Sequence, residues 1–228
     1  MKAILFDNDG VLADTEGLYY RACRDTLRSH GFDLTPAEYR EVSLRRGEST
    51  IDFAARGALS AAALRGLKAE RDDVYLGLLN REAEPREGIE EVLTALHGKA
   101  AMAVVTAAHR VHFDAIHKRT GLARYFDFVL TQEDCPTSKP DSAPYLMALK
   151  RGGWRAEDCV VIEDTERGLA SAHAANLRCF VVPCGPSVGG CFEGAEAVLP
   201  DLAALQSALI ELFQGEADKS NKSMPGTD

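Results

Sequence analysis

The sequence AILFDNDGVL, residues 3–12, decides the fold that this chain is expected to adopt. Its first four residues, Ala3 to Phe6, form an apolar run that is typical of a buried strand in a parallel sheet. Asp7 and Asp9 follow directly, and Gly10 allows the backbone to turn there. Open α/β folds bind their ligands at the carboxyl ends of such strands. The stretch therefore predicts the first strand of a parallel sheet, with acidic side chains where a ligand would bind.

Four further apolar runs indicate more strands of the same kind. They are residues 102–105, 126–130, 159–162 and 179–182. Segments of apolar residues with helical spacing alternate with the runs. One example is residues 89–96, which precede the run 102–105. Alternating strands and helices predict an α/β fold with a doubly wound parallel sheet.

Residues 15–85 interrupt this alternation, because they carry helical patterns and no strand pattern. Apolar residues from Leu18 to Leu27 share one helical face, and a later helical pattern starts at Ser60. Between them, Thr35-Pro36-Ala37-Glu38 has the form of a capping box with proline at the first helical position. We therefore predict an all-helical cap domain inserted into the core. The expected domains are a core of residues 1–14 and 86–213, a cap of residues 15–85, and a flexible tail of residues 214–228, which are polar and lack periodicity.

Composition and charge exclude several kinds of partner. With 46% hydrophobic and 27% charged residues, the 228-residue chain can bury a core. Its formal net charge of −9 argues against nucleic-acid binding, which requires a basic surface. No apolar run approaches the roughly 18 residues of a membrane span, and acidic residues begin too early for a signal peptide. We expect a cytoplasmic monomer with no nucleic-acid partner and no membrane partner.

Polar residues follow the later strands as well. Thr106 follows the run 102–105, Glu163 and Asp164 follow the run 159–162, and Lys139 lies in the sequence Ser-Lys-Pro-Asp at residues 138–141. Aspartate and glycine favour turns, so residues 7–10 alone could simply cap a loop. In a doubly wound sheet, however, the strand ends converge on one crevice. We therefore expect at least four carboxylates, one hydroxyl and one ammonium group to meet there.

So many carboxylates require a cation. Two unit charges 4 Å apart repel by about 1 kcal/mol in water and by about 4 kcal/mol at an effective dielectric constant of 20. Lys139 supplies one positive charge but cannot replace a divalent ion. Oxygen ligands from Asp7, Asp164 and the carbonyl of Asp9 suit Mg²⁺, which keeps its other positions for water and a substrate phosphate. The sequence thus predicts a magnesium site for an anionic substrate.

The candidate residues form four blocks along the chain: Asp7 with Asp9, then Thr106, then Lys139, then Glu163 with Asp164. In this order, the blocks resemble the motifs of the haloacid dehalogenase superfamily of phosphotransferases. The resemblance covers about residues 1–213 and points to the subfamily whose helical cap is inserted after the first motif. Residues 168–176, GLASAHAAN, are also similar to the helix that follows the fourth motif of this family. The resemblance implies a core with a Rossmann-like sheet and a Mg²⁺-dependent phosphatase that acts on a small phosphorylated metabolite.

The resemblance also implies a role for each motif residue. The nucleophile would be Asp7, which forms an aspartyl-phosphate, and the acid that protonates the leaving alcohol and then activates water would be Asp9. Phosphoryl oxygens would be held by Thr106 and Lys139. The metal site would consist of Asp7, Asp9, Asp164 and Glu163, the last through a metal-bound water.

Three alternative functions are compatible with parts of the same motifs. Dehalogenases of the family lack an acid at the position of Asp9, because a halide leaving group needs no proton, so phosphate chemistry is favoured. Sugar-phosphate mutases such as β-phosphoglucomutase carry a histidine where this chain has Tyr19 and an arginine where it has Thr50. A hydrolase is therefore favoured over a phosphomutase. An inactive phosphometabolite sensor is the non-enzymatic alternative.

Further residues are candidates for substrate contact. Asn8 and Ala107 lie within or directly after the motifs, and His109 follows Thr106 closely. From the cap, Arg46 stands beside Gly47 in a loop that could face the crevice, and Tyr19 could close over the substrate. The candidate substrate-binding residues are thus Asn8, Ala107, Arg46, Tyr19 and His109.

Overall fold

The computed structural model describes residues 2–55 and 57–222 and has at its centre one six-stranded sheet. The strand order is β3-β2-β1-β4-β5-β6, and every neighbouring pair is parallel. The strands are β1 (Ala3–Phe6), β2 (Ala101–Val105), β3 (Phe128–Leu130), β4 (Cys159–Glu163), β5 (Arg178–Val181) and β6 (Ala197–Val198). This confirms the predicted α/β fold. It adds β6, whose two residues are too few to show a strand pattern in the sequence.

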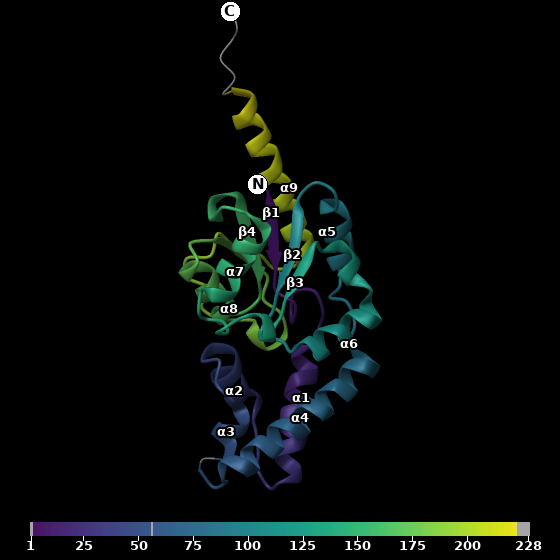
Figure 1. The fold of residues 1–228 in the computed structure, drawn as a ribbon, viewed down its shortest axis with the longest axis vertical. Helices are drawn as coiled ribbons and strands as arrows, with labels where there is room; N and C mark the ends of the chain where they lie inside the picture. Colours follow the sequence, from purple (N-terminus) through teal and green to yellow (C-terminus); the bar gives the residue numbers. More distant parts are fainter. Residues whose placement is uncertain (1, 56, 223–228) are drawn as a thin grey trace, which may run out of the picture.

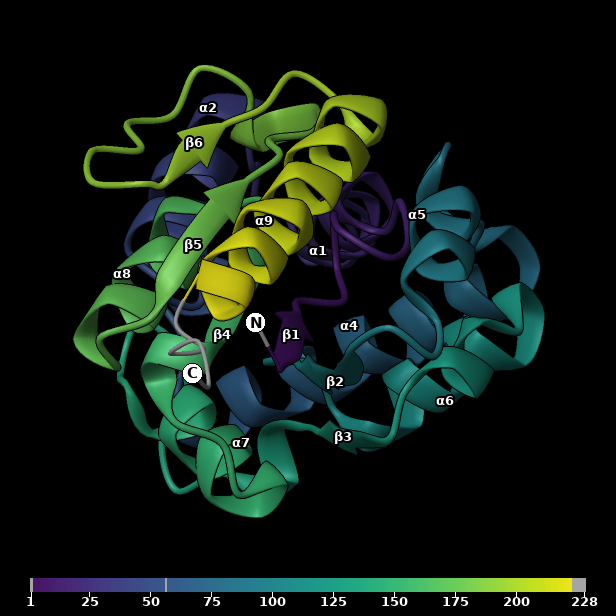
Figure 2. The same cartoon turned by 90° about the horizontal axis from the view of Figure 1, so that it is seen from above.

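Helices cover both faces of the sheet, and the alternation of side chains along β1 shows how (Figures 1 and 2). Ile4 and Phe6 are fully buried on the face that packs against α5, α6 and α9, while Ala3 and Leu5 are buried on the face that packs against α7 and α8. The bounds are α5 (Ile89–Leu96), α6 (Arg110–Thr120), α7 (Ala143–Gly152), α8 (Glu166–Ala174) and α9 (Leu202–Lys222). Four short 3₁₀ segments join them: η2 (Leu122–Tyr125), η3 (Gln132–Asp134), η4 (Ala156–Asp158) and η5 (Gly185–Ser187).

The segment between β1 and α5 is helical and lies at the carboxyl end of the strands, below the sheet in Figure 1. The predicted capping box forms, since the Thr35 hydroxyl accepts a hydrogen bond from the backbone N–H of Glu38 and the Glu38 carboxylate accepts one from that of Thr35. The helical elements are α1 (Glu16–Ser29), α2 (Pro36–Tyr39), the π-helical η1 (Arg40–Arg45), α3 (Thr50–Ala55) and α4 (Ala61–Glu82). They bury an apolar cluster of their own: Cys23, Leu27, Leu34, Tyr39, Leu44, Ile51 and Leu67.

The chain enters and leaves this helical segment at one place. Ala13, just before it, forms an antiparallel bridge with Pro85, just after it. The bridge supports the predicted division of the chain near residues 15 and 85, which otherwise stays a prediction.

The C-terminal part of the chain differs from the expectation. The flexible tail was expected to begin at residue 214, but α9 continues to Lys222. Most residue types in this stretch, such as Glu, Ala and Lys, tolerate or favour a helix even without an apolar stripe. The rest of the predicted tail, residues 223–228, lies outside the described residues.

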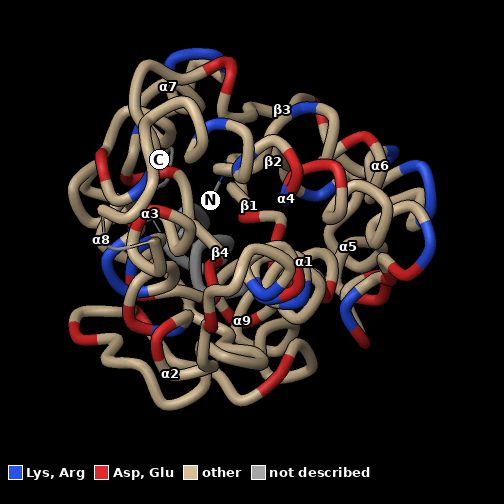
Figure 3. The backbone as a smooth tube through the Cα atoms, turned by 90° about the horizontal axis from the view of Figure 1, so that it is seen from below, with Lys and Arg blue, Asp and Glu red and all other residues tan. Residues whose placement is uncertain are grey.

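Charged residues of both signs are interspersed around the molecule (Figure 3). Within the described ranges, none of the helices combines the length and the apolar character that crossing a bilayer requires.

Candidate active site

The turn after β1 brings the first motif against the end of β4. The backbone N–H of Asp7 still donates to the carbonyl of Ile162 in β4 (2.9 Å). The chain then turns back, and the carbonyl of Asn8 accepts the N–H of Leu12 (2.8 Å). Gly10 has a φ of +79°, and a Cβ at this position would overlap the carboxylate of Asp164. Only glycine lets the first motif approach the fourth so closely.

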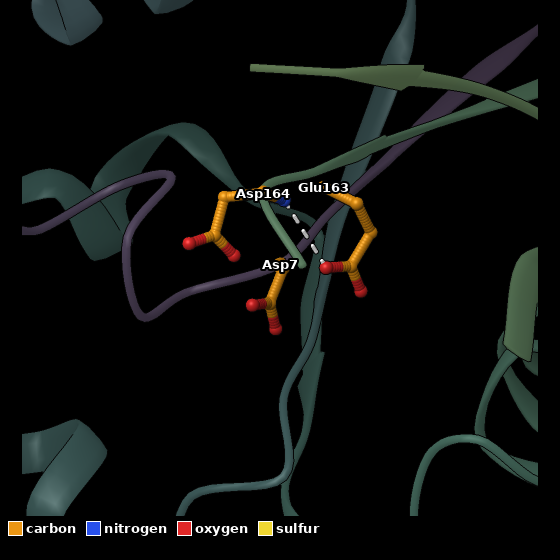
Figure 4. Close-up of side chains that lie close together, drawn as sticks. All are labelled: Asp7, Glu163 and Asp164. Carbon is orange, nitrogen blue, oxygen red and sulfur yellow. Dashed lines mark hydrogen bonds between the residues drawn. The ribbon is translucent and has the colours of Figure 1, made fainter. Parts of the chain in front are cut away.

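Three carboxylates meet where β1 and β4 end. Asp7, Glu163 and Asp164 are all buried, and each offers an oxygen within 4.8 Å of the others. Figure 4 shows the carboxylates of Asp7 and Asp164 facing the same space, while that of Glu163 lies on the other side of Asp7. The backbone N–H of Asp164 donates to Glu163 Oε2 (3.3 Å). The predicted convergence of the first and fourth motifs is therefore present.

Lys139 joins two of these carboxylates. Its Nζ donates to Asp7 Oδ1 (2.7 Å), to Glu163 Oε1 (2.6 Å) and to the carbonyl of Val105 (2.8 Å). Burial acts to lower the pKa of Lys139, but the two carboxylates outweigh it and the net pKa is raised. The hydroxyl of Tyr145 also donates to Glu163 Oε1 (2.7 Å). Lys139 is thus held as a cation, and Oε1 of Glu163 is fixed by two donors.

One positive charge does not balance the cluster. Burial and then the charge of Glu163 raise the pKa of Asp7 to about 7, although Lys139 acts against this. Burial and then the charge of Asp7 raise the pKa of Asp164 well above its usual value. Asp164 Oδ1 is buried and has no hydrogen-bond partner among the described residues. Hard oxygen donors with one unpartnered oxygen fit a divalent cation such as Mg²⁺.

The carboxylate of Asp9 lies apart from this cluster. Its Oδ1 accepts hydrogen bonds from Thr15 Oγ1 (2.6 Å) and Tyr75 OH (3.3 Å), and its Oδ2 accepts one from Thr106 Oγ1 (3.4 Å). Asp9 is not among the three carboxylates that could hold a metal. Its side chain therefore lies outside the metal cluster, and only its carbonyl remains as the metal ligand predicted from the sequence.

A crevice of about 510 Å³ opens above these residues, between the helical segment and the sheet. This is the size of a pocket for a small metabolite. Of the predicted site residues, those that line it are Asp7, Asp9, Tyr19, Thr106, Ala107, His109 and Lys139. Thr106 is buried at the end of β2, where its hydroxyl accepts the N–H of Ala108 (3.0 Å). His109 Nδ1 is hydrogen-bonded to Glu133 (2.8 Å).

Two predicted substrate contacts are not brought into the crevice. The Asn8 side chain is fully buried, where its Oδ1 is hydrogen-bonded to His117 Nε2 (2.8 Å) and its Nδ2 donates to Asp9 (3.2 Å). Arg46 forms ion pairs with Glu48 (3.3 Å) and Glu41 (3.7 Å) and does not line the crevice. Asn8 faces inward because its backbone forms the turn, and Arg46 is held by the acidic residues beside it.

Other residues of the site were not found from the sequence. Tyr145 and Tyr75 lie on the buried faces of α7 and α4, where a tyrosine is part of the apolar pattern of the helix. Arg71 reaches Tyr19 from α4 (2.7 Å). Arg167 lies three residues after Asp164, and its closeness to the fourth motif is the one feature of the sequence that could have singled it out.

Comparison with known proteins settles the family. Residues 4–182 match the model of the haloacid dehalogenase-like hydrolase family. The chain belongs to this family. It is therefore a hydrolase, and the matched residues include the buried carboxylates of Asp7, Glu163 and Asp164.

Three similar proteins illustrate the moderate identity of the relatives. The chain is 29% identical over 76% of its length to the fructose-1-phosphate phosphatase YqaB of Escherichia coli, covering 92% of that protein. It is 31% identical over 80% of its length to the chloroplastic protein Suppressor of Quenching 1 of Arabidopsis thaliana, but this match spans only 18% of that longer protein. The crystal structure of mutant CbbY from Rhodobacter sphaeroides in complex with xylulose-1,5-bisphosphate superimposes with a TM-score of 0.79 at 27% identity, over 90% of this chain and 96% of CbbY.

Proposed function

We propose that the protein is a Mg²⁺-dependent phosphatase that hydrolyses a small phosphorylated metabolite, such as a sugar phosphate, through an aspartyl-phosphate intermediate. The observation that carries the proposal is the different placement of the two aspartate carboxylates after β1. Asp7 lies in the buried carboxylate cluster beside Lys139, whereas the carboxylate of Asp9 lies outside it and is held by Thr15. The names of the E. coli relative and of the CbbY complex support a phosphorylated sugar as substrate.

The first half of the reaction would transfer the phosphoryl group to the protein. A carboxylate oxygen of Asp7 attacks phosphorus, and the bond from phosphorus to the ester oxygen breaks. Protonated Asp9 gives its proton to that leaving oxygen, which departs as an alcohol. Lys139 and Thr106 hold the phosphoryl oxygens while this happens.

The second half would return the protein to its starting state. Asp9, now ionised, takes a proton from a water molecule, and the water oxygen attacks phosphorus. The bond from Asp7 to phosphorus breaks, so that inorganic phosphate leaves and both carboxyl groups are restored. A Mg²⁺ ion held by Asp7, Asp164 and the Asp9 carbonyl, with Glu163 reaching it through water, would supply positive charge to the phosphoryl oxygens in both halves.

Tyr19 favours hydrolysis over phosphomutase activity. It lines the crevice, and its hydroxyl accepts a hydrogen bond from Arg71. The sequence resemblance predicts that this is the position of the histidine of the mutases. A phosphomutase would have to hold a second phosphate while its intermediate turns around. Phosphorus NMR on a sugar 1-phosphate separates the two activities, since a phosphatase yields free phosphate and a mutase yields the 6-phosphate.

Turnover of 4-nitrophenyl phosphate with Mg²⁺ tests the proposal. We expect Asp7→Asn to lower the rate by about 10³-fold or more, and chelation of metal to abolish turnover that added Mg²⁺ restores. Asp25→Asn is the matched control, because Asp25 is paired with Arg24 on the surface of α1. An unchanged rate in Asp7→Asn would remove Asp7 from its role, and a parent protein without any turnover would favour the phosphometabolite sensor.

A further inference from the structure

The cations that line the crevice differ in whether they have an acidic partner. Lys68 is paired with Asp52 (2.6 Å), Arg71 with Asp72 (2.8 Å), and Lys139 with Asp7 and Glu163. Arg167 lines the same crevice, yet no carboxylate of the described residues lies within ion-pair distance of it. One guanidinium in the crevice is thus left without the anion that the other three cations have.

The position of Arg167 is fixed by the packing around it. It lies in the first turn of α8, next to Glu166, whose carboxylate pairs with Arg45 of η1 (3.0 Å). Gly47 of the cap has a φ of +65°, and a Cβ there would crowd Arg167 Cδ. The guanidinium therefore lies where the cap meets α8 of the core. Its Nε is buried without a hydrogen-bond partner among the described residues.

The acidic group that interacts with Arg167 does not take the place of a partner. Glu16 also lines the crevice and interacts electrostatically with Arg167, but its carboxylate accepts the hydroxyl of Tyr39 (2.7 Å). Burial raises the pKa of Glu16 to about 7, so that near neutral pH much of it is protonated. A neutral Glu16 would repel an incoming anion little.

We propose that Arg167 binds a second anionic group of the substrate, remote from the phosphoryl group that is transferred. The inference rests on the proposed phosphatase function and narrows its substrate class to phosphate esters that carry another phosphate or a carboxylate. A guanidinium offers two parallel N–H donors that match either oxyanion. Arg167 would then decide specificity and take no part in the chemical steps at Asp7.

Steady-state kinetics with three substrates tests the proposal. 4-Nitrophenyl phosphate has no second anion, fructose 1,6-bisphosphate has a second phosphate, and 2-phosphoglycolate has a carboxylate. We expect Arg167→Gln to raise KM about tenfold or more for one or both of the latter, with kcat/KM for 4-nitrophenyl phosphate nearly unchanged. The more affected of the two identifies the anion, and Arg167→Lys should restore part of the loss. Arg40→Gln removes an exposed cation of η1 that lies outside this crevice, and should change none of the three.

Binding without turnover gives a second readout. In the Asp7→Asn background, calorimetry compares fructose 1,6-bisphosphate and 2-phosphoglycolate with fructose 1-phosphate, which has no second anion. Tighter binding of a ligand with a second anionic group, which Arg167→Gln abolishes, supports the proposal. Equal effects of Arg167→Gln on every ligand, or no preference for a second anion in the parent, overturn it. If the parent hydrolyses none of the substrates, the phosphatase function itself is refuted. If the parent hydrolyses them and Arg167→Gln affects all of them equally, only the role of Arg167 is refuted.

Discussion

At the scale of single residues, the buried site depends on Lys139. Its ammonium touches both Asp7 and Glu163, and removal of one member of a buried ion pair leaves an uncompensated charge. In metal-free protein we expect Lys139→Met to lower the free energy of unfolding by about 3–5 kcal/mol near pH 8. The loss should be smaller near pH 5, because Asp7, whose pKa is already raised to about 7, takes up a proton there.

Urea denaturation at the two pH values measures this difference. Lys68→Met is the control, since the pair that Lys68 forms with Asp52 is partly exposed. Such pairs contribute about 1 kcal/mol or less, and the pH should matter little. Equal losses for Lys139→Met at both pH values would show that Lys139 does not act by balancing the buried carboxylates.

Single residues also show how far a sequence can predict a site. Asp7, Thr106 and Asp164 were predictable because each stands at or just after the carboxyl end of a buried parallel strand, where such folds bind their ligands. Asn8 was predicted to contact substrate, but its side chain points into the core. The regular alternation of side chains along β1 stops at the turn that the backbone of Asn8 forms, so it could not predict this direction. Arg167 was missed, because an arginine in a helix looks like a solvated charge until the cap that covers it is known.

At the scale of elements, α8 follows the fourth motif and needs a glycine in its first turn. Gly168 has ordinary helical geometry, but a Cβ there would overlap the carboxylate of Glu163. We expect Gly168→Ala to displace Glu163 from Lys139, to lower the melting temperature and to weaken Mg²⁺ binding. Gly66→Ala in α4 is the matched control, because nothing lies within 4 Å of its added Cβ.

The two alanine variants should move in opposite directions. Alanine is favoured over glycine within a helix by up to about 1 kcal/mol, so Gly66→Ala should raise the melting temperature and leave Mg²⁺ affinity unchanged. Circular dichroism melts and Mg²⁺ titrations of both variants provide the comparison. If Gly168→Ala were as harmless as Gly66→Ala, the close packing of α8 on Glu163 would play no part in the site.

Elements were predictable where their patterns are long. The capping box at Thr35 and the start of α4 after Ser60 lie where the sequence indicated. The six-residue α3 and the two-residue β6 were not predicted, since so few residues show no periodicity. The predicted tail, which starts at residue 214, overlaps α9, because a polar sequence that continues a helix resembles a tail.

At the scale of the whole molecule, the pKa values predict how metal and pH together set stability. Asp7 has a pKa raised from 3.8 to about 7, and that of Asp164 is raised as well. A carboxyl group with a raised pKa binds its proton more tightly in the folded state. Its stabilising contribution is complete below about pH 4 and is lost as the pH rises through about 7. Metal-free protein should therefore lose stability over this range.

A bound divalent cation should reverse that loss. We expect Mg²⁺ to raise the melting temperature clearly near pH 8 and little near pH 5, where protons compete for the same carboxylates. Differential scanning calorimetry with Mg²⁺ and with a chelator measures the shift at each pH. Asp164→Asn should abolish the shift near pH 8, and a shift that persists in this variant would place the cation elsewhere.

The strand order explains why a site assembled from distant segments could be anticipated at all. Because β1 lies between β2 and β4, the residues that follow these three strands share one edge of the sheet. The arrangement of the cap over that edge depends on contacts such as Arg45 with Glu166, which join residues far apart in the sequence. Substrate contacts from the cap were accordingly the least predictable part of the site.

Chemical trapping of the phosphorylated protein tests the central proposal most directly. The parent is mixed with Mg²⁺ and a substrate that it hydrolyses, and the reaction is quenched with acid. Treatment with borohydride then reduces an aspartyl-phosphate to homoserine. Mass spectrometry of the peptides should find homoserine at position 7, and none in Asp7→Asn or in samples without substrate. An enzyme that releases phosphate while position 7 remains aspartate throughout, or that carries the phosphoryl group on another residue, would contradict the account.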